Sequence, residues 1–234
     1  MLDLSHNRLD GPLPARALAA LGCLRTLRLR GNRLTGAVPW RALSGDTAGD
    51  ARAAPPPLRE LDLAHNRLSG RLDGDALAAL RELSWLDLSR NALTGPLPSA
   101  PEGAGFPPKL RYLALSHNAL TGAVPLALGA ACPRLVELRL DANHLEGDAA
   151  GPCGALARAC ARLRVVRAHG NAMLSGRVAA RAALAAGLPR CSVGLDFGDA
   201  GEMRASRAPA LLRTSALWLD GMHAQIDAEH GDLQ

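Results

Sequence analysis

The triplet Asp196-Phe197-Gly198 is the first candidate for chemistry in this chain. It matches the metal-binding triplet of protein kinases, but a kinase also needs a glycine-rich loop, a strand lysine and a His-Arg-Asp loop. None of these motifs occurs, and Lys109 is the only lysine. The chain also lacks a Gly-x-Ser-x-Gly nucleophile motif, a phosphate-binding loop and a dinucleotide fingerprint. The sequence therefore predicts a protein that is not an enzyme and that needs no cofactor.

Four residues near the carboxyl end have side chains that could bind a metal: His223, Asp227, Glu229 and His230. They lack the His-Glu-x-x-His spacing, which places two imidazoles on one face of a helix around zinc. We therefore expect a solvated polar tail at these positions and no metal site.

The five cysteines offer a second possible chemistry, and Cys153 and Cys160 are closest in sequence. They lie in a segment expected to be helical, where seven residue steps separate two Cα atoms by roughly 10 Å. A disulfide requires a Cα separation below about 7 Å. We therefore expect two reduced thiols, at least one of them packed as a small apolar residue. No Cys-x-x-Cys motif occurs, which disfavours a zinc site.

A repeated segment must position any functional residue in this chain. The pattern Leu-x-x-Leu-x-Leu-x-x-Asn-x-Leu first appears complete from Leu24 to Leu34 and then recurs. Successive asparagines are 25, 34, 25, 27, 25 and 28 residues apart, a period typical of leucine-rich repeats. The seven asparagines are Asn7, Asn32, Asn66, Asn91, Asn118, Asn143 and Asn171.

Each position of the repeat has a physical role. The Leu-x-Leu alternation predicts a short strand with its leucines pointing inward and the intervening residues facing solvent. The asparagine amide can bond turn backbone that would otherwise be buried and unsatisfied, so stacked copies predict an asparagine ladder. A single repeat is unable to bury its own leucines, so neighbouring repeats must complete the core. Aromatic residues make up only 3% of the chain, which leaves an aliphatic core.

The segments between these strands differ in character. Residues 15–24 and 75–83 are rich in Ala and Leu at helical spacing and predict short helices. Residues 99–108 are rich in Pro and Gly, and residues 44–57 exceed the period, so both predict irregular loops. Alternating apolar residues over 193–197 predict one last degenerate strand.

Several repeats continue past the asparagine as Leu-x-Gly-x-Leu/Val-Pro, for example from Leu34 to Pro39 and from Leu120 to Pro125. This extension resembles the plant-type leucine-rich repeat of receptor-like kinase ectodomains and polygalacturonase-inhibiting proteins. The resemblance implies an α/β right-handed horseshoe with a parallel sheet on the concave face, helices or irregular segments on the convex face, and a second short strand in each repeat. It also implies recognition of peptides, glycans or pathogen enzymes. The expected location is extracellular or at the plasma membrane if a missing amino-terminal segment carries a signal peptide, and cytoplasmic otherwise.

We place a solenoid of about seven repeats at residues 1–180, and degenerate terminal repeats or a cap and tail at residues 181–234. The chain starts inside a repeat, which suggests a fragment. Leu2, Leu4 and Leu9 are therefore expected to be exposed at an uncovered end that favours self-association.

The composition limits the classes of partner. The net charge is +5 and the sequence pI is about 9.4, but the arginines are scattered along the sequence and form no basic run. Nucleic-acid recognition needs a basic stripe, so we expect no nucleic-acid partner. No apolar run reaches the length of about 18 residues that a membrane helix needs, so we expect no membrane insertion by this chain.

The strand alternation predicts a candidate ligand site on the concave face. Trp85 and Tyr112 fall at equivalent positions of neighbouring strands and are expected to face solvent, as interface hot spots do. Asp62 and Asp87 are also neighbours, and an incoming Arg or Lys would relieve their repulsion. We expect these four residues, with Arg90 and His117 at the edge, to bind a protein or peptide ligand. In one alternative the aromatics only pack on each other, and in another the chain is a scaffold segment of a larger protein.

Overall fold

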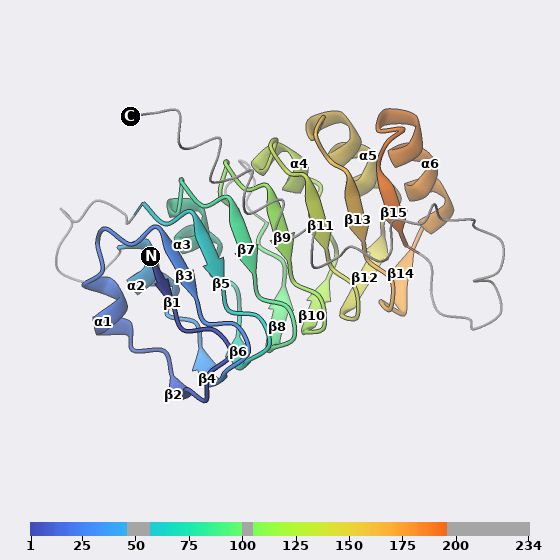
Figure 1. Ribbon diagram of the computed structural model, residues 1–234. Helices are drawn as coiled ribbons and strands as arrows, with labels where there is room; N and C mark the ends of the chain where they lie inside the picture. The colour runs from blue at the N-terminus through green and yellow to red at the C-terminus, as the bar shows by residue number, and fades with distance from the viewer. Residues whose placement is uncertain (46–56, 100–104, 196–234) are drawn as a thin grey trace, which may run out of the picture. The chain divides into compact units, whose positions relative to one another are not determined.

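The computed structural model describes residues 1–45, 57–99 and 105–195. These residues belong to one structural unit, Met1–Phe197. Each repeat forms one coil of a solenoid, so strands of successive repeats lie side by side (Figure 1).

The Leu-x-Leu segments form an eight-stranded parallel sheet, and the predicted pairing of successive segments is confirmed. The register aligns equivalent leucines, so that Leu61 pairs with Leu27 on one side and with Leu86 on the other. The last strand pairs with its predecessor, as the alternation over 193–197 predicts. In sheet order the strands are β1 (Leu2–Asp3), β3 (Thr26–Arg28), β5 (Glu60–Asp62), β7 (Trp85–Asp87), β9 (Tyr112–Ala114), β11 (Glu137–Arg139), β13 (Val165–Arg167) and β15 (Ser192–Gly194).

The segment after each asparagine forms a second parallel sheet, with seven strands. This is the second strand that the plant-type extension implies. The glycine of the extension has a positive φ, as at Gly36 (74°) and Gly122 (73°), a conformation that costs glycine little. The strands are β2 (Asp10–Pro12), β4 (Arg33–Ala37), β6 (Arg67–Gly70), β8 (Ala92–Pro96), β10 (Ala119–Gly122), β12 (His144–Asp148) and β14 (Met173–Ser175).

Short helices connect the second sheet back to the first and lie along one side of the solenoid (Figure 1). The helices predicted over 15–24 and 75–83 are present but end early, because after each of them the backbone turns back toward the eight-stranded sheet. Leu24 N–H donates to Leu21 O and Leu83 N–H donates to Leu80 O in these turns, both at 2.9 Å. The described helices are α1 (Ala15–Ala19), α2 (Trp40–Ser44), α3 (Gly74–Ala79), α4 (Leu128–Ala131), α5 (Ala150–Ala159) and α6 (Arg177–Gly187).

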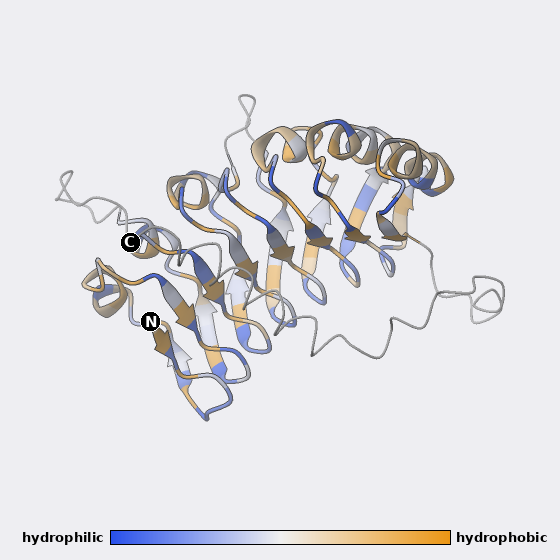
Figure 2. Ribbon diagram, turned by 45° about the horizontal axis from the view of Figure 1, so that its top comes forward, coloured by the Kyte–Doolittle hydropathy of each residue, from blue (hydrophilic) through white to orange (hydrophobic). Residues whose placement is uncertain are grey.

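The core is a continuous column of leucines between the two sheets and the helices. Leu88 and Leu115 have no exposed surface, and hydrophobic colour recurs from strand to strand of the eight-stranded sheet in Figure 2. Burial of a leucine side chain contributes about 1.5–3 kcal/mol, and here each leucine is covered by the coils on either side. Stability is therefore shared between neighbouring coils.

The predicted asparagine ladder is confirmed. Asn118 Nδ2 donates to Leu115 O of its own coil and to Leu88 O of the preceding coil, both at 3.0 Å. Its Oδ1 accepts from Leu93 N, also at 3.0 Å. Asn7 of the first coil is exposed and donates only to carbonyls of its own turn. The same three contacts as at Asn118 occur at Asn32, Asn66, Asn91, Asn143 and Asn171.

The first coil exposes apolar surface. Leu4 is 39% exposed and Leu9 is 38% exposed, which confirms the prediction for these two residues, whereas Leu2 is half-buried. Strand β1 is the edge of the eight-stranded sheet and β2 is the edge of the second sheet.

The expectation for the closest cysteine pair is also confirmed. Cys153 and Cys160 are free and buried at the two ends of α5. Cys160 Sγ lies 3.3 Å from Cys132 O of the preceding coil. Burial raises the thiol pKa of both Cys153 and Cys160 to about 11, so both are neutral at physiological pH.

Candidate functional site

The candidate site lies on the side of the eight-stranded sheet that faces away from the leucines, which we call the eight-strand face. It is the predicted concave face. The first and third residues of each three-residue strand lie on it, and the register puts equivalent residues next to one another. One row of this face is formed by Glu60, Trp85, Tyr112 and Glu137.

Trp85 and Tyr112 lie side by side as predicted, but the prediction that they are exposed is wrong. Trp85 is 3% exposed and Tyr112 is 2% exposed. Their rings stack with centroids 3.7 Å apart and planes 8° from parallel, so each ring covers a face of the other. The cross-strand aromatic pair considered as an alternative is the arrangement present.

A charged pair completes the row beside Tyr112. The Arg139 guanidinium carbon lies 5.7 Å from the Tyr112 ring centroid, within cation–π range. Glu137 Oε1 accepts a hydrogen bond from Arg139 Nε, whereas Glu137 Oε2 is buried and accepts none within the described part of the chain. Burial, and then the negative charge of Asp87, raise the pKa of Tyr112, so its hydroxyl stays protonated.

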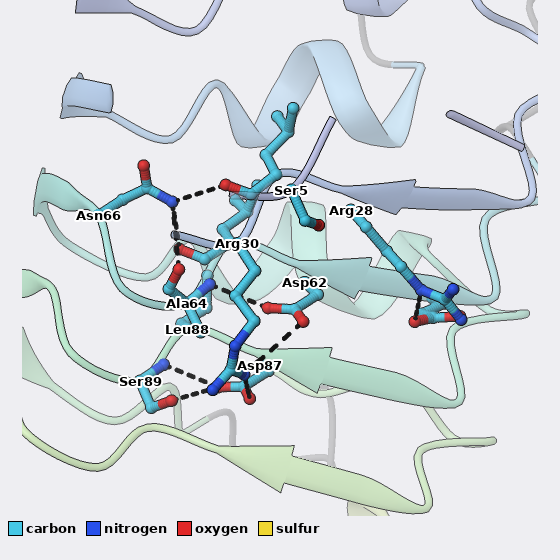
Figure 3. A network of polar contacts seen from close by, with 12 residues as sticks. Ser5, Arg28, Arg30, Asp62, Ala64, Asn66, Asp87, Leu88 and Ser89 are labelled. Carbon is cyan, nitrogen blue, oxygen red and sulfur yellow. Dashed lines mark hydrogen bonds and ion pairs between the residues drawn. The ribbon is translucent and has the colours of Figure 1, made fainter. Parts of the chain in front are cut away.

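Asp62 and Asp87 are cross-strand neighbours, as predicted, and both are buried. The prediction that an incoming cation would relieve their repulsion needs correction, because Arg30 already lies between them (Figure 3). Arg30 Nη1 is 3.3 Å from Asp87 Oδ2 and 3.8 Å from Asp62 Oδ2. Burial, and then the neighbouring charge of Asp87, raise the pKa of Asp62 to about 7.

Both aspartates also close the turn at the end of their strand. Asp62 Oδ1 accepts from Ala64 N at 3.0 Å, and Asp87 Oδ1 accepts from Ser89 N at 2.9 Å (Figure 3). The same carboxylates are therefore held by local turn geometry as well as by Arg30.

Arg90 and His117 lie in the exposed turns after β7 and β9, at the edge of the face as predicted. Both have φ of 55°, which is uncommon for residues other than glycine. The equivalent residues in two other coils are Gly31 and Gly170, also with positive φ. Because two coils have glycine at this position, the sequence indicated that Arg90 and His117 would also adopt a left-handed turn conformation.

Sequence reasoning missed several side chains of this site. Arg30 lies after the strand and reaches two coils along the sheet, and Glu137 and Arg139 were not singled out. Arg28 also binds Glu60 of the next coil in a bidentate contact, at 2.5 and 2.8 Å (Figure 3). Opposite charges at neighbouring positions of consecutive repeats were the signal for this last pair.

The described residues place aromatic and charged side chains together on the eight-strand face. No group of three or more possible metal ligands gathers within them, and none of the described helices has the length and apolar character needed to cross a membrane. The kinase-like triplet and the four polar residues of the tail lie outside the described residues. What the face offers is an aromatic stack flanked by carboxylates and guanidinium groups.

Comparison with known proteins identifies the type of repeat. A family model described as leucine rich repeat matches residues 49–93. No curated protein sequence matches the chain.

Solved structures share the fold. The plant peptide hormone receptor RGFR1 in complex with RGF2 is 22% identical, with a TM-score of 0.61 over 84% of this chain and 32% of that chain. A TDR receptor is 24% identical, with a TM-score of 0.58 over 83% of this chain and 34% of that chain. The PEPR1–AtPEP1 structure is 22% identical, with a TM-score of 0.51 over 85% of this chain and 31% of that chain. This chain therefore spans about a third of the length of these receptors.

Proposed function

We propose that this chain, a member of the leucine-rich-repeat family with plant-type repeats, is a non-catalytic module that binds a protein or peptide on its eight-strand face. We also propose that it acts as part of a receptor-like protein at the cell surface. The chain shares its fold with a plant peptide hormone receptor, which is consistent with this proposal.

The observation that carries the proposal is the chemistry of the row through Trp85, Tyr112 and Glu137. A spacer segment needs only bland residues on this face, whereas here an aromatic stack, a buried acidic pair and a buried ion pair occupy neighbouring strands. Clustered aromatic and charged residues are typical of interface hot spots.

Glu137 Oε2 gives the row a specific binding preference. A buried acceptor without a hydrogen bond costs about 1–3 kcal/mol. Because Oε2 is buried, a ligand N–H or cationic group must first displace the side chains that cover it, and its hydrogen bond to Oε2 would then remove this cost. The proposed site therefore comprises Trp85, Tyr112, Asp62 and Asp87, with Arg90 and His117 at its edge and Glu137 beside Tyr112.

The test is selection of random twelve-residue peptides, displayed on phage, against the full chain, followed by titration of the enriched peptides. Because Trp85 is buried, its truncation would disturb folding as well as binding. Two conservative changes are preferable: Tyr112→Phe keeps the ring stack, and Glu137→Gln keeps the side-chain shape. The matched control is Glu146→Gln, which changes an exposed carboxylate in the second sheet.

We expect each of the two site variants to weaken peptide binding at least about tenfold, and the control to change it less than about twofold. The thermal unfolding midpoint of each variant shows whether the fold is retained. If the enriched peptides bind both site variants as tightly as the unchanged chain, ligand binding at this row is refuted.

A further inference from the structure

Arginines that are scattered in the sequence share equivalent positions in the coils. Three consecutive coils have an arginine just before the first apolar position of the motif: Arg134 before Leu135, Arg162 before Leu163, and Arg190 before Cys191, which replaces the leucine. Two coils also have an arginine just after the first leucine of the motif: Arg111 follows Leu110, and Arg164 follows Leu163 two coils later. With Lys109, which precedes Leu110 of the motif, these residues form what we call the basic ridge: Lys109, Arg111, Arg134, Arg162, Arg164 and Arg190.

Backbone hydrogen bonds show that the ridge runs in one line across the strand starts. Val136 N donates to Arg111 O at 2.8 Å, and Arg164 N donates to Val136 O at 2.7 Å. Ser192 N then donates to Arg164 O at 2.7 Å. Successive coils are therefore spaced by about 4.8 Å, as paired strands are. In Figure 2 the segments that lead from the helices into these strands include hydrophilic stretches beside hydrophobic ones.

Among the described residues, four arginines of the ridge lack an ion-pair partner. Lys109 Nζ lies 2.6 Å from Glu82 Oε1. Arg134, Arg162, Arg164 and Arg190 are exposed and form no ion pair with any described residue. Like charges on neighbouring strands are unfavourable without a counter-charge.

The first half of the same sheet shows how such charges are balanced. There Arg28 binds Glu60 of the next coil in a bidentate contact, and Arg30 is held by Asp62 and Asp87. Carboxylates from neighbouring coils thus neutralise guanidinium groups. Arg134, Arg162, Arg164 and Arg190 have no matching carboxylate among the described residues.

We propose that the basic ridge binds an extended acidic polypeptide segment of a partner protein. The planar guanidinium fork matches a carboxylate, as the Arg28–Glu60 pair illustrates. The ridge spans four coils, or about 15 Å, which is the length of about five extended residues. A segment with about five residues rich in Asp and Glu would therefore contact every coil of the ridge.

The types of residue along the ridge disfavour single-stranded nucleic acid as its ligand. Such ligands are held by aromatic side chains that stack on the bases. In the seven coils after the first, the equivalent positions, from Cys23 and Arg25 to Arg190 and Ser192, include no aromatic residue. The ridge borders the Trp85–Tyr112 row, because Arg111 directly precedes Tyr112, and it adds a second contact to the proposed function.

The test compares two variants with equal charge. Replacing four ridge arginines by Gln (R134Q, R162Q, R164Q and R190Q) removes four charges from a net +5 and leaves +1. The matched control replaces four exposed arginines near the second sheet (R8Q, R33Q, R67Q and R71Q) and leaves the same +1. The probe is a fluorescein-labelled peptide of alternating Glu and Ser, titrated with each full-length protein by fluorescence anisotropy at 50 and 200 mM salt.

We expect the unchanged chain to bind the peptide more weakly at the higher salt concentration. The ridge variant should bind at least about tenfold more weakly than the unchanged chain, and the control less than about twofold. Equal losses in both variants, a loss only in the control, or no binding by the unchanged chain would overturn the proposal. Tighter binding of single-stranded DNA or a sulfated polysaccharide of equal charge would also overturn it, by assigning the ridge to another polyanion.

The two proposals fail separately. The Tyr112→Phe and Glu137→Gln variants keep the ridge and should bind the Glu–Ser peptide like the unchanged chain. The ridge variant keeps the aromatic row and should retain peptides selected through that row.

Discussion

The buried Asp62–Asp87 pair predicts an unusual dependence of stability on pH. The substitution Asp62→Asn removes one of the two facing charges. The Asn side-chain oxygen still accepts the hydrogen bond from Ala64 N, which Asp62 Oδ1 accepts at 3.0 Å. Arg30 keeps its closer partner, Asp87, at 3.3 Å. The variant therefore tests the charge of Asp62 with little change in local geometry.

The magnitude follows from the raised pKa of Asp62, about 7 in the folded chain against an ordinary value of 3.8. Each pKa unit corresponds to about 1.36 kcal/mol, so the linked free energy is about 4 kcal/mol. Between these two values the folded state holds more protons than the unfolded state. The free energy of unfolding therefore falls as the pH rises from about 4 to 7, and the loss is complete above pH 7.

The assay is urea denaturation of both proteins from pH 4 to pH 9, followed by circular dichroism. We expect Asp62→Asn to be more stable than the unchanged chain by about 2–4 kcal/mol at pH 8 and nearly equal in stability at pH 4. The gain at pH 8 comes from removing a buried charge, and it is reduced because the attraction of that charge to Arg30 is also lost. The control Asp10→Asn alters an exposed carboxylate and should shift the curve by less than about 0.5 kcal/mol. Parallel curves for Asp62→Asn and the unchanged chain between pH 5 and pH 8 would refute the reasoning.

Three further predictions concern the solenoid. Leu115→Ala should lower the free energy of unfolding by about 2–5 kcal/mol, because Leu115 is fully buried, and a loss below half a kcal/mol in urea denaturation would contradict its place in the core. Asn118→Ala should cost at least about 2 kcal/mol, because backbone groups of two coils lose their partner, whereas Asn7→Ala should cost under about 1 kcal/mol; equal losses in the same assay would contradict the ladder. The exposed Leu4 and Leu9 should promote association of the isolated chain, so a monodisperse monomer at high concentration in sedimentation velocity would contradict that expectation.

The repeat made much of the fold predictable. A period near 25 residues and the Leu-x-Leu alternation place each strand, because a strand with one buried face has only one register that keeps its leucines inside. The ladder follows for the same reason: Asn118 and its equivalents close the same turn in every coil. The boundary near residue 180 between repeats and tail remains a proposal.

The candidate site was only partly predictable. Alternation correctly placed Trp85 and Tyr112 on the same face and next to each other, but it says nothing about how much of a side chain its neighbours cover. Because paired strands are about 4.8 Å apart, two large rings at equivalent positions can stack, and stacking removes much of their exposed surface. The exposure predicted from alternation was therefore wrong, while the adjacency was right.

The sequence alone determines which residues share a row of the sheet, because every coil repeats the same sequence of turn, strand and loop. Only the tertiary structure decides which residues of other rows and coils a long side chain contacts. Arg30 reaches Asp87, 57 residues away, because two coils of the sheet separate them. The ridge of Arg134, Arg162 and Arg190 has the same origin: winding the chain brings charges about 28 residues apart to within the spacing of neighbouring coils.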